Sequence, residues 1–384
     1  MSSSDFDTDL SSLSDDELIQ LKMKHEQIAG VHNTKQQAFK ILINSAYGGV
    51  GNSYFLYYSV ENAEAITVTG RVGIKWIEKK VNDKINRILK NEEYKDYIIA
   101  IDTDSIYVNL YDIVKAVFGE YTADNPNSIN NKEEVVDFID KFCRDKINPY
   151  IEKCYEELSD YLNSYENHMD MKREIISDNA IWTGKKRYMM QVMYDEDKKI
   201  VDKPKKKVMG IETVKSSTPY VCREKLKEVI NLALTKENDA LIEYIDDFKE
   251  HFDELSVEEI AFPRGVTEIH KWVESDGKTV KSGCPINVRA SIVYNNMIDF
   301  HNLGKKYKKI GEGDQMRFVY LKTPNPAHSN VIGFPEVLPK ELDLHSYIDY
   351  NLQFKKVFLA PIESITEVIG WDTEKKFKLE DFFV

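Results

Sequence analysis

The sequence YIIAIDTDSIYVNL occupies residues 97–110 and decides how the surrounding chain is interpreted. Two short apolar runs flank a polar turn at 102–105, and this pattern predicts a strand–turn–strand hairpin. The turn places the carboxylates of Asp102 and Asp104 at the tip, where their oxygens can converge on a hard cation such as Mg²⁺. Phosphate oxygens would then complete the octahedral ligand set of that cation. An ordinary acidic turn is the competing interpretation, because aspartate is common in turns.

Helical patterns precede and follow the hairpin. The acidic start, residues 1–17, is expected to be a disordered tail, and the capping-box spacing of Ser14 and Glu17 predicts that a helix begins near its end. Apolar periodicity predicts further helices at about 34–47 and 61–89, and a helical pair after residue 219. Because short strands and loops fill much of the remainder, the predicted fold class is α+β.

The composition is that of a globular chain with an excess of acid. Its 384 residues are 42% hydrophobic, which is enough for a sizeable core and for two or three domains. The net charge of −13 argues against a simple nucleic-acid coat protein. The charge is uneven, however, since residues 185–215 hold ten basic and five acidic side chains. The sequence therefore predicts a basic surface in the middle of an acidic protein.

Cysteine usage and hydropathy bear on the compartment. The four cysteines lie far apart and form no C-x-x-C pair, so neither a disulfide framework nor a zinc site is suggested. The longest uncharged run, residues 41–60, contains polar side chains and three glycines, so we expect no membrane span there. No signal peptide is apparent. A cytoplasmic protein fits these features best.

A polar helical face precedes the hairpin. Lys40, Asn44 and Tyr47 are spaced so that they share one side of a helix, and three glycines follow within four residues. A cation, an amide and an aromatic ring beside open backbone suit a nucleoside triphosphate. A solvated stripe on an amphipathic helix is the alternative, and from spacing alone it is the commoner occurrence.

A basic segment follows the hairpin. Residues 182–188 place three cations between aromatic side chains at the start of an expected strand, and residues 203–207 add four lysines. Such a surface suits a nucleic-acid backbone and groove. A solvated, charged hairpin explains the same composition equally well.

The order of these motifs resembles a known family. Lys40-x-x-x-Asn44-Ser45-x-Tyr47-Gly48 precedes Asp102-Thr103-Asp104-Ser105, followed by Lys185-Lys186-Arg187-Tyr188 and Gly210-x-Glu212-x-x-Lys215. This order resembles the C-terminal part of family B replicative DNA polymerases of the T-even-type bacteriophage branch, from about residue 18 to residue 384. The resemblance implies a fragment of a right-hand polymerase, with a mixed palm sheet plus helices and a largely helical thumb. The implied domains are a tail at 1–17, a fingers remnant at 18–53, a palm at 54–211, a thumb at 212–370 and a clamp-binding tail at 371–384.

The resemblance also implies roles for the first two motifs. Lys40 and Asn44 would face the incoming dNTP, and Tyr47 would pack under the nascent base pair. Asp102 and Asp104 would be the catalytic carboxylates that bind two Mg²⁺ ions, with Asp104 the stronger ligand.

Further roles are implied for the later motifs. Glu174 would be an additional acidic metal position in the palm, although Lys172 stands where this branch commonly has an aspartate. Binding of primer–template DNA would involve Lys185, Lys186, Arg187, Tyr188, Lys215 and Arg289.

The end of the chain carries a last implied site. Leu379, Phe382 and Phe383 resemble a phage polymerase ending that inserts into a sliding clamp. A tail that docks on its own thumb is the alternative, because terminal aromatic side chains often cover exposed core.

Two departures from the family pattern limit the resemblance. Ala100 and Ile101 replace the usual aromatic residue and glycine before the Asp turn, and no D-x-x-S-L-Y-P-S-like strand supplies the remaining catalytic aspartate. The 3′–5′ exonuclease domain is also absent. The chain is therefore expected to be the C-terminal subunit of a split polymerase, or a fragment, that needs an N-terminal partner. A non-catalytic module that binds DNA and the sliding clamp is the alternative.

Overall fold

The computed structural model describes residues 13–119, 132–196, 198–201, 203–235 and 237–375. Contacts divide the chain into two compact units, which we describe separately. Unit 1 comprises residues up to Phe118 together with Asp145–Met171, and unit 2 comprises Gly119–Arg144 and the chain from Lys172 onward. The predicted disordered tail, apart from residues 13–17, and the predicted clamp-binding residues Leu379, Phe382 and Phe383 lie outside the described residues.

Unit 1 begins with one long helix, α1 (Asp15–Val50). The predicted capping box is confirmed, since the Ser14 side chain accepts from the backbone N–H of Glu17 while the Glu17 carboxylate accepts from the backbone N–H of Ser14. The expectation of a separate second helix at 34–47 was wrong. Residues 22–33 lack an apolar period, but they contain no proline and a single glycine, Gly30, so the helical backbone continues without a break.

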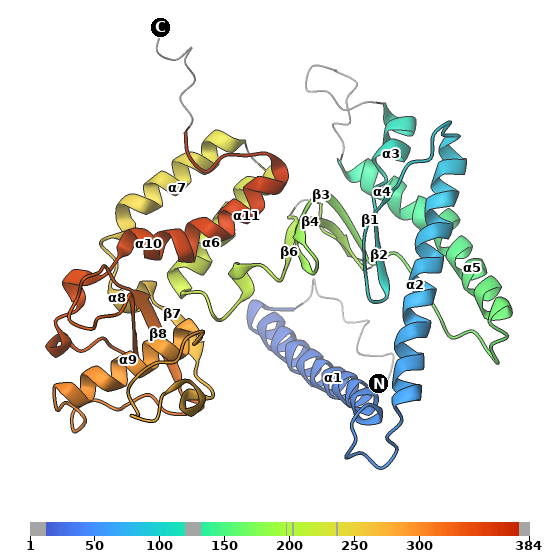
Figure 1. Ribbon diagram of the computed structural model, residues 1–384. Coiled ribbons are helices and arrows are strands. Elements are labelled where there is room, and N and C mark those ends of the chain that lie inside the picture. Colours follow the sequence, from blue (N-terminus) through green and yellow to red (C-terminus); the bar gives the residue numbers. More distant parts are fainter. Residues whose placement is uncertain (1–12, 120–131, 197, 202, 236, 376–384) are drawn as a thin grey trace, which may run out of the picture. The chain divides into compact units, whose positions relative to one another are not determined.

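The core of unit 1 forms between two helices that lie side by side in Figure 1, α2 (Val60–Leu89) and α5 (Asn148–Tyr161). The apolar face of α2 is buried only from Gly73 onward. The indole N–H of Trp76 donates to the carbonyl of Cys154 (2.9 Å), which ties the two helices together. Buried α2 side chains with helical spacing are Ile74, Ile77, Val81 and Ile85.

The predicted hairpin is confirmed as β1 (Ile98–Asp102) and β2 (Ser105–Val108), an antiparallel pair that packs on α2 and leads into α3 (Tyr111–Phe118). The register runs from Ile98 opposite Val108 to Asp102 opposite Ser105 and contains a bulge between Ile98 and Ala100. The bulge leaves Ile99 without a direct partner, and its side chain is exposed.

The first part of unit 2 is an antiparallel sheet. Its strands are β3 (Ile175–Gly184), β4 (Arg187–Asp195), β5 (Lys198–Lys199) and β6 (Lys205–Met209). Strand β4 pairs with β3 and β6, and it meets β5 only at its end. The pairing of β4 with β5 is thus a minor part of a larger sheet. Helix α4 (Lys132–Phe142) packs against β3, and a π-helical turn (Cys143–Ile147) follows it.

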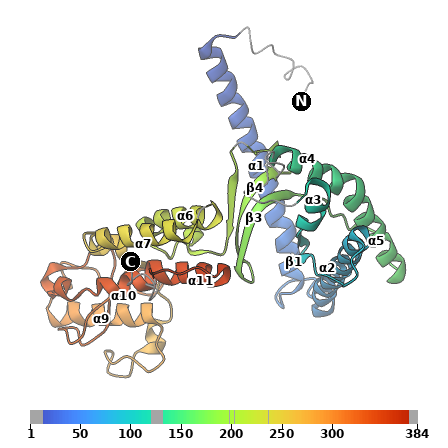
Figure 2. The same ribbon diagram turned by 90° about the horizontal axis from the view of Figure 1, so that it is seen from above.

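The rest of unit 2 holds the largest core. The expected helical pair is α6 (Tyr220–Thr235) and α7 (Asn238–Phe252). Helix α10 (Tyr350–Phe354) contacts α7, and α11 (Ala360–Ile369) contacts α6. Figure 2 shows the four helices in one group. Helix α8 (Val257–Ile260) leads into the sheet of β7 (Phe262–Gly265), β8 (Gln315–Tyr320) and β9 (Val331–Phe334), on which α9 (Ile286–Phe300) packs. Short 3₁₀ turns occupy Glu212–Val214, Ile269–Trp272, Lys340–Leu342 and His345–Tyr347, and a π-helical turn, Lys355–Leu359, joins α10 to α11. The fold class is α+β, as predicted from the sequence.

The helices of the described ranges include none whose length and apolar character would let it cross a membrane.

Candidate functional site

The two candidate catalytic carboxylates lie at the tip of β1–β2. Asp102 ends β1 and is half-buried, whereas Asp104 lies in the turn and is exposed. The hydroxyl of Ser105 donates to the carbonyl of Asp102 (3.0 Å), and the hydroxyl of Thr103 donates to the Asp102 carboxylate (3.1 Å). Thr103 has a φ of 55°, which is a costly conformation for a β-branched residue. The tip is therefore a strained turn whose geometry is maintained by its own hydroxyl groups.

A third carboxylate of unit 1 shares the surroundings of Asp104. Burial raises the pKa of the Tyr155 hydroxyl on α5, and the negative charges of Asp104 and Asp170 raise it further. Both carboxylates are thus within electrostatic range of one hydroxyl. Our sequence reasoning did not single out Asp170. Its position two residues before Lys172, where the resembled branch commonly has an aspartate, was the available signal.

The fit of a divalent metal can be tested on these residues. Within the described ranges, no three histidine, cysteine, aspartate or glutamate side chains gather closely enough to hold a metal ion by themselves. The hairpin tip presents two carboxylates, which are ligands of the right class for Mg²⁺. Mg²⁺ commonly takes only one or two protein carboxylates and completes its shell with water and substrate phosphates. Asp102 and Asp104 thus fit part of such a ligand set.

The predicted nucleotide-binding residues lie on the C-terminal part of α1. Lys40, Asn44 and Tyr47 are all exposed. The apolar side chains between them are exposed as well, with Ile41 and Ile43 at 64% and 70% exposure. No residue of α1 is buried against the rest of the described chain. A solvated stripe on an amphipathic helix requires an opposite face that packs on a core, and α1 has no such face among the described residues.

Glu174 belongs to unit 2 and stands just before β3. It is exposed, and its carboxylate lies 4.0 Å from the Lys207 ammonium on β6. Its neighbour Arg173 forms an ion pair with Asp140 and stacks its guanidinium 4.2 Å from the ring centre of Tyr194. Arg173 therefore fixes the backbone from which the Glu174 side chain projects.

The basic segment forms the turn between β3 and β4. Lys185 and Lys186 are exposed there, and Lys186 has a φ of 58°. Gly210, just after the end of β6, has a φ of 66°, and a Cβ at this position would lie 2.2 Å from the Lys186 carbonyl oxygen. Only glycine allows so close an approach. Gly210, the first residue of the Gly210-x-Glu212 motif, therefore packs directly against the backbone of the basic turn at Lys186.

Two predicted DNA-binding cations converge on Glu212. The guanidinium of Arg187 donates two hydrogen bonds to its carboxylate (3.1 and 2.9 Å), and the Lys215 ammonium donates a third (3.0 Å). Although burial acts to raise the pKa of Glu212, the hydrogen bonds from Lys215 and Arg187 outweigh it and lower the pKa below 4.5. The sequence did not predict this cluster, although Glu212 and Lys215 belong to one motif and Arg187 to another.

The other predicted DNA-binding residues differ in exposure. The Tyr188 side chain is 5% exposed and packs on Trp182, with ring centres 5.7 Å apart. Arg289, on α9, is half-buried and donates to the Asn330 side chain (3.0 Å). The basic turn therefore presents Lys185 and Lys186 outward, while Arg187 and Tyr188 build the sheet beneath them.

Comparison with known proteins gives the sequence a family context. The family model described as DNA polymerase family B matches residues 17–132. The chain is 34% identical over 393 residues to the DNA-directed DNA polymerase of Enterobacteria phage T4, and the match covers 99% of this chain and 42% of that protein. It is 34% identical over 375 residues to the polymerase of Escherichia phage RB69, covering 94% and 40%. DNA polymerase 1 of Pyrococcus abyssi is 24% identical over 341 residues, covering 88% and 35%.

The chain thus spans about two fifths of the length of the phage relatives that it matches. The family-model match includes α1 and the hairpin tip, whereas the basic turn lies beyond it. The phage polymerases nevertheless match nearly the whole chain.

Proposed function

Because the chain belongs to the T4-type family B DNA polymerases, we propose that it supplies part of the catalytic centre and the primer-binding surface of a DNA-directed DNA polymerase. The observation that carries this proposal is the hairpin that presents Asp102 and Asp104 at its tip, inside the segment that matches the family model. The proposed place of action is the cytoplasm of a phage-infected cell.

The proposed reaction is template-directed nucleotidyl transfer. Two bound Mg²⁺ ions would stabilise the charge that develops when the primer 3′-hydroxyl attacks the α-phosphate of a dNTP and pyrophosphate leaves. Asp104 and Asp102 would bind the metal ions at the tip, and Glu174 would add a further acidic group. Lys40 would bind the triphosphate through charge-assisted hydrogen bonds.

The remaining roles follow the same proposal. Asn44 and Tyr47 would contact the incoming nucleotide and the nascent pair from the α1 face. Lys185 and Lys186 would touch the DNA backbone, with Arg187, Tyr188 and Lys215 shaping the turn that carries them, and Arg289 would contact the duplex from α9.

We further propose that the centre is completed by a polypeptide that corresponds to the N-terminal part of the relatives. Two observations support this. The described residues supply only two carboxylates at the hairpin tip, and α1 has no buried residue although it carries several large apolar side chains. The second polypeptide would contribute the remaining catalytic aspartate and the exonuclease. A split subunit and a segment of a longer chain meet this requirement equally.

Primer extension tests the proposal. The chain alone should extend a primer negligibly, whereas addition of a purified N-terminal part of a T4-type polymerase should restore synthesis. In the restored enzyme, Asp104→Asn should lower the rate at least about a hundredfold, because it removes charge from a site of metal-mediated stabilisation. Asp16→Asn, the same chemical change at the exposed start of α1, is the matched control. Robust extension by the chain alone would contradict the need for a partner.

A non-catalytic module that binds DNA and a clamp is the second candidate. The exposed Lys185 and Lys186 favour it, since a backbone-binding turn needs no metal. Salt-dependent DNA binding without extension under any complementation would support this candidate against the first.

The clamp-binding tail stays a proposal for Leu379, Phe382 and Phe383. Deletion of residues 376–384 should lower processive synthesis with a sliding clamp and leave distributive synthesis unchanged. A lowered melting temperature with intact clamp stimulation would instead indicate a tail that docks on its own thumb.

A further inference from the structure

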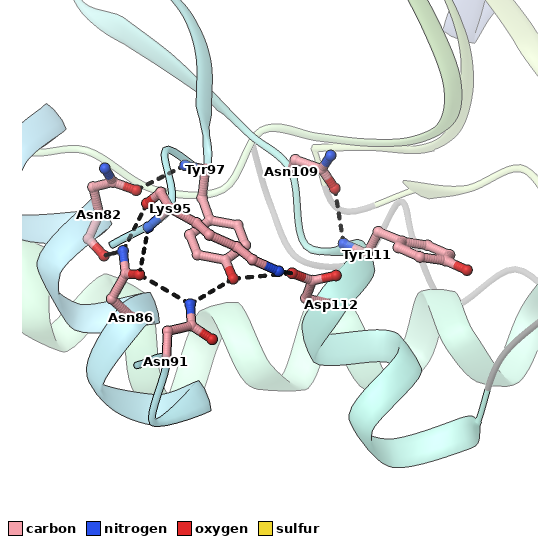
Figure 3. A network of polar contacts seen from close by, with 8 residues as sticks. All are labelled: Asn82, Asn86, Asn91, Lys95, Tyr97, Asn109, Tyr111 and Asp112. Atoms are coloured by element: carbon pink, nitrogen blue, oxygen red, sulfur yellow. Dashed lines mark hydrogen bonds and ion pairs between the residues drawn. The ribbon is translucent and has the colours of Figure 1, made fainter. Parts of the chain in front are cut away.

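The base of the β1–β2 hairpin raises a physical problem. A two-stranded hairpin is marginally stable by itself, and this one contains a bulge between Ile98 and Ala100. Its tip, however, carries the carboxylates that the proposed function requires in a fixed place. Some other part of unit 1 must therefore hold the hairpin, and a network of polar side chains at its base does so (Figure 3).

Two buried asparagines of α2 begin this network. Asn82 and Asn86 are one helical turn apart, and they are only 5% and 8% exposed. The side-chain amide oxygen of Asn82 accepts from the backbone N–H of Tyr97 (2.8 Å). The Asn86 amide pairs with the backbone of Lys95 on both sides, accepting from its N–H (2.9 Å) and donating to its carbonyl (2.8 Å). The asparagines thus replace a neighbouring strand for the backbone that enters β1.

The Tyr97 hydroxyl extends the network to α3. It accepts a hydrogen bond from the Asn91 amide (2.8 Å) and donates one to the Asp112 carboxylate (3.0 Å). The Asn91 side-chain amide also donates to the side-chain amide oxygen of Asn86 (2.9 Å), and the Lys95 ammonium lies 3.2 Å from the Asp112 carboxylate. Figure 3 shows the Tyr97 hydroxyl between Asn91 and Asp112, so that one oxygen joins the end of α2 to the start of α3.

The returning strand is tied to the same point. The backbone N–H of Asn109 donates to the carbonyl of Tyr97 (2.8 Å). The Asn109 side chain then accepts from the backbone N–H of Tyr111 (2.9 Å), which fixes the entry into α3. Both ends of the hairpin are therefore held within one set of hydrogen bonds that centres on Tyr97.

We propose that Asn86, Asn91, Tyr97 and Asp112 are positioning residues that set the register and tilt of the hairpin, and through it the place of Asp102 and Asp104. The inference rests on the proposed function for its catalytic consequence. The buried amides would be left unsatisfied by a slipped hairpin, so the network favours a single arrangement.

A small tilt at the base of the hairpin produces a larger displacement at its tip, where Asp102 and Asp104 lie. The strand from residue 97 to residue 102 spans about 17 Å, so a tilt of about 3–4° at the base would move the tip by about 1 Å. Displacements of about 1 Å can cost about a hundredfold in rate when reacting groups must be aligned.

Hydrogen exchange of the full chain tests the hold on the hairpin. Tyr97→Phe removes only the bridging oxygen, and it should speed amide exchange in residues 98–108 about tenfold. Asp112→Asn keeps an acceptor for the Tyr97 hydroxyl, so its amide exchange in residues 98–108 should stay close to that of the unchanged chain. Asp112→Ala removes the acceptor and should speed this exchange as much as Tyr97→Phe does. Tyr150→Phe is the matched control, because its hydroxyl joins α5 to Arg87 of α2 (3.0 Å) and does not touch the hairpin. Unchanged exchange in 98–108 in Tyr97→Phe, or an equal rise throughout α2 and α5, would overturn the proposal.

The restored polymerase gives the second readout. Tyr97→Phe should lower kcat about ten- to a hundredfold with an unchanged KM for dNTP, since the α1 face is intact. An unchanged kcat beside a loosened hairpin would overturn the catalytic part of the proposal. Failure of the unchanged chain to extend with any partner would overturn the proposed function instead, and the exchange result would still decide whether the network holds the hairpin.

Discussion

Helices α1 and α9 differ sharply in what they bury. Helix α1 has 36 residues and no buried side chain, whereas α9 has 15 residues, of which seven are buried. Both carry large apolar residues, so hydrophobicity does not explain the contrast. Helix α9 packs on a sheet of its own unit, and α1 meets no such surface among the described residues. The helix with the nucleotide-binding motif therefore gains little stability from this chain, while the C-terminal core stabilises itself.

Removal of a phenylalanine from each region should give the largest difference. Phe252 is fully buried and packs on Phe354, with ring centres 5.1 Å apart. Phe252→Ala should lower the free energy of unfolding by about 3–5 kcal/mol, because it leaves a cavity. Phe39 is 65% exposed, and Phe39→Ala should change it by less than about 0.5 kcal/mol. Urea unfolding measures both, and equal losses would break the contrast between the regions.

Glycine replacement should give the next largest effect, with opposite signs. Gly210→Ala should destabilise unit 2 by about 1–3 kcal/mol, because of its positive φ and the contact with the Lys186 carbonyl. Gly30 lies inside α1, and beyond the backbone of its own helix nothing comes within 4 Å of where a Cβ would lie, so Gly30→Ala should stabilise the helix by up to about 1 kcal/mol. Urea unfolding reports the first change, and amide exchange of α1 reports the second. A Gly210→Ala variant that is more stable than the unchanged chain would contradict the close backbone contact between Gly210 and the basic turn.

Low pH should produce a smaller difference in stability between the two regions. The folded pKa of Glu212 is below 4.5, so its ion pairs stabilise unit 2 above about pH 4.5 and this contribution is lost as the pH falls through the lowered folded value. Glu212→Gln should therefore flatten the pH dependence of the urea midpoint below about pH 4.5. Hydrogen bonds from the Ser14 backbone and side chain lower the pKa of Glu17 too, but this residue lies outside any core. Glu17→Gln should leave the midpoint unchanged, and a comparable flattening would count against the contrast.

The smallest expected effect concerns the surface of the basic turn. Lys186→Ala should weaken primer–template binding and lower the slope of log affinity against log salt by about one, as expected when one phosphate contact is lost. Lys215→Ala should lower it further if the Glu212 pair opens on DNA. Lys227→Ala, an exposed α6 lysine paired with Glu224 (2.7 Å), is the control. Binding curves at several salt concentrations measure these slopes, and an unchanged slope in the variant that combines Lys186→Ala with Lys215→Ala would restore the solvated-hairpin interpretation.

The sequence predicted those features that depend on local patterns. The capping box at Ser14, the periodic face of α2 and the hairpin around residues 102–105 all follow from neighbours in the chain. The continuity of α1 did not, because residues 22–33 lack an apolar period and nothing local marks them as helix or loop. Periodicity detects packed faces, and α1 has none.

The polar contacts of the site were harder to predict. Arg187 and Glu212 are 25 residues apart, and their pairing depends on where β6 returns beside β4. The asparagines at the base of the hairpin have no hydrophobic signature, and only the fold shows that they replace a strand. The tertiary fold thus determines which charged and amide side chains form hydrogen bonds and ion pairs. The residue types determine only that such bonds are possible.

The length of α1 has a mechanical consequence. Its 36 residues form a rod about 54 Å long that is joined to α2 through the segment 51–59. Lys40 lies ten residues from the α2 end of this rod, at about 15 Å. Each degree of rotation about that end would displace Asp15 by about 0.9 Å but Lys40 by only about 0.3 Å. A force applied near the N-terminus of α1 would therefore reach the Lys40 face with a mechanical advantage of about three to four, as a small and strong movement.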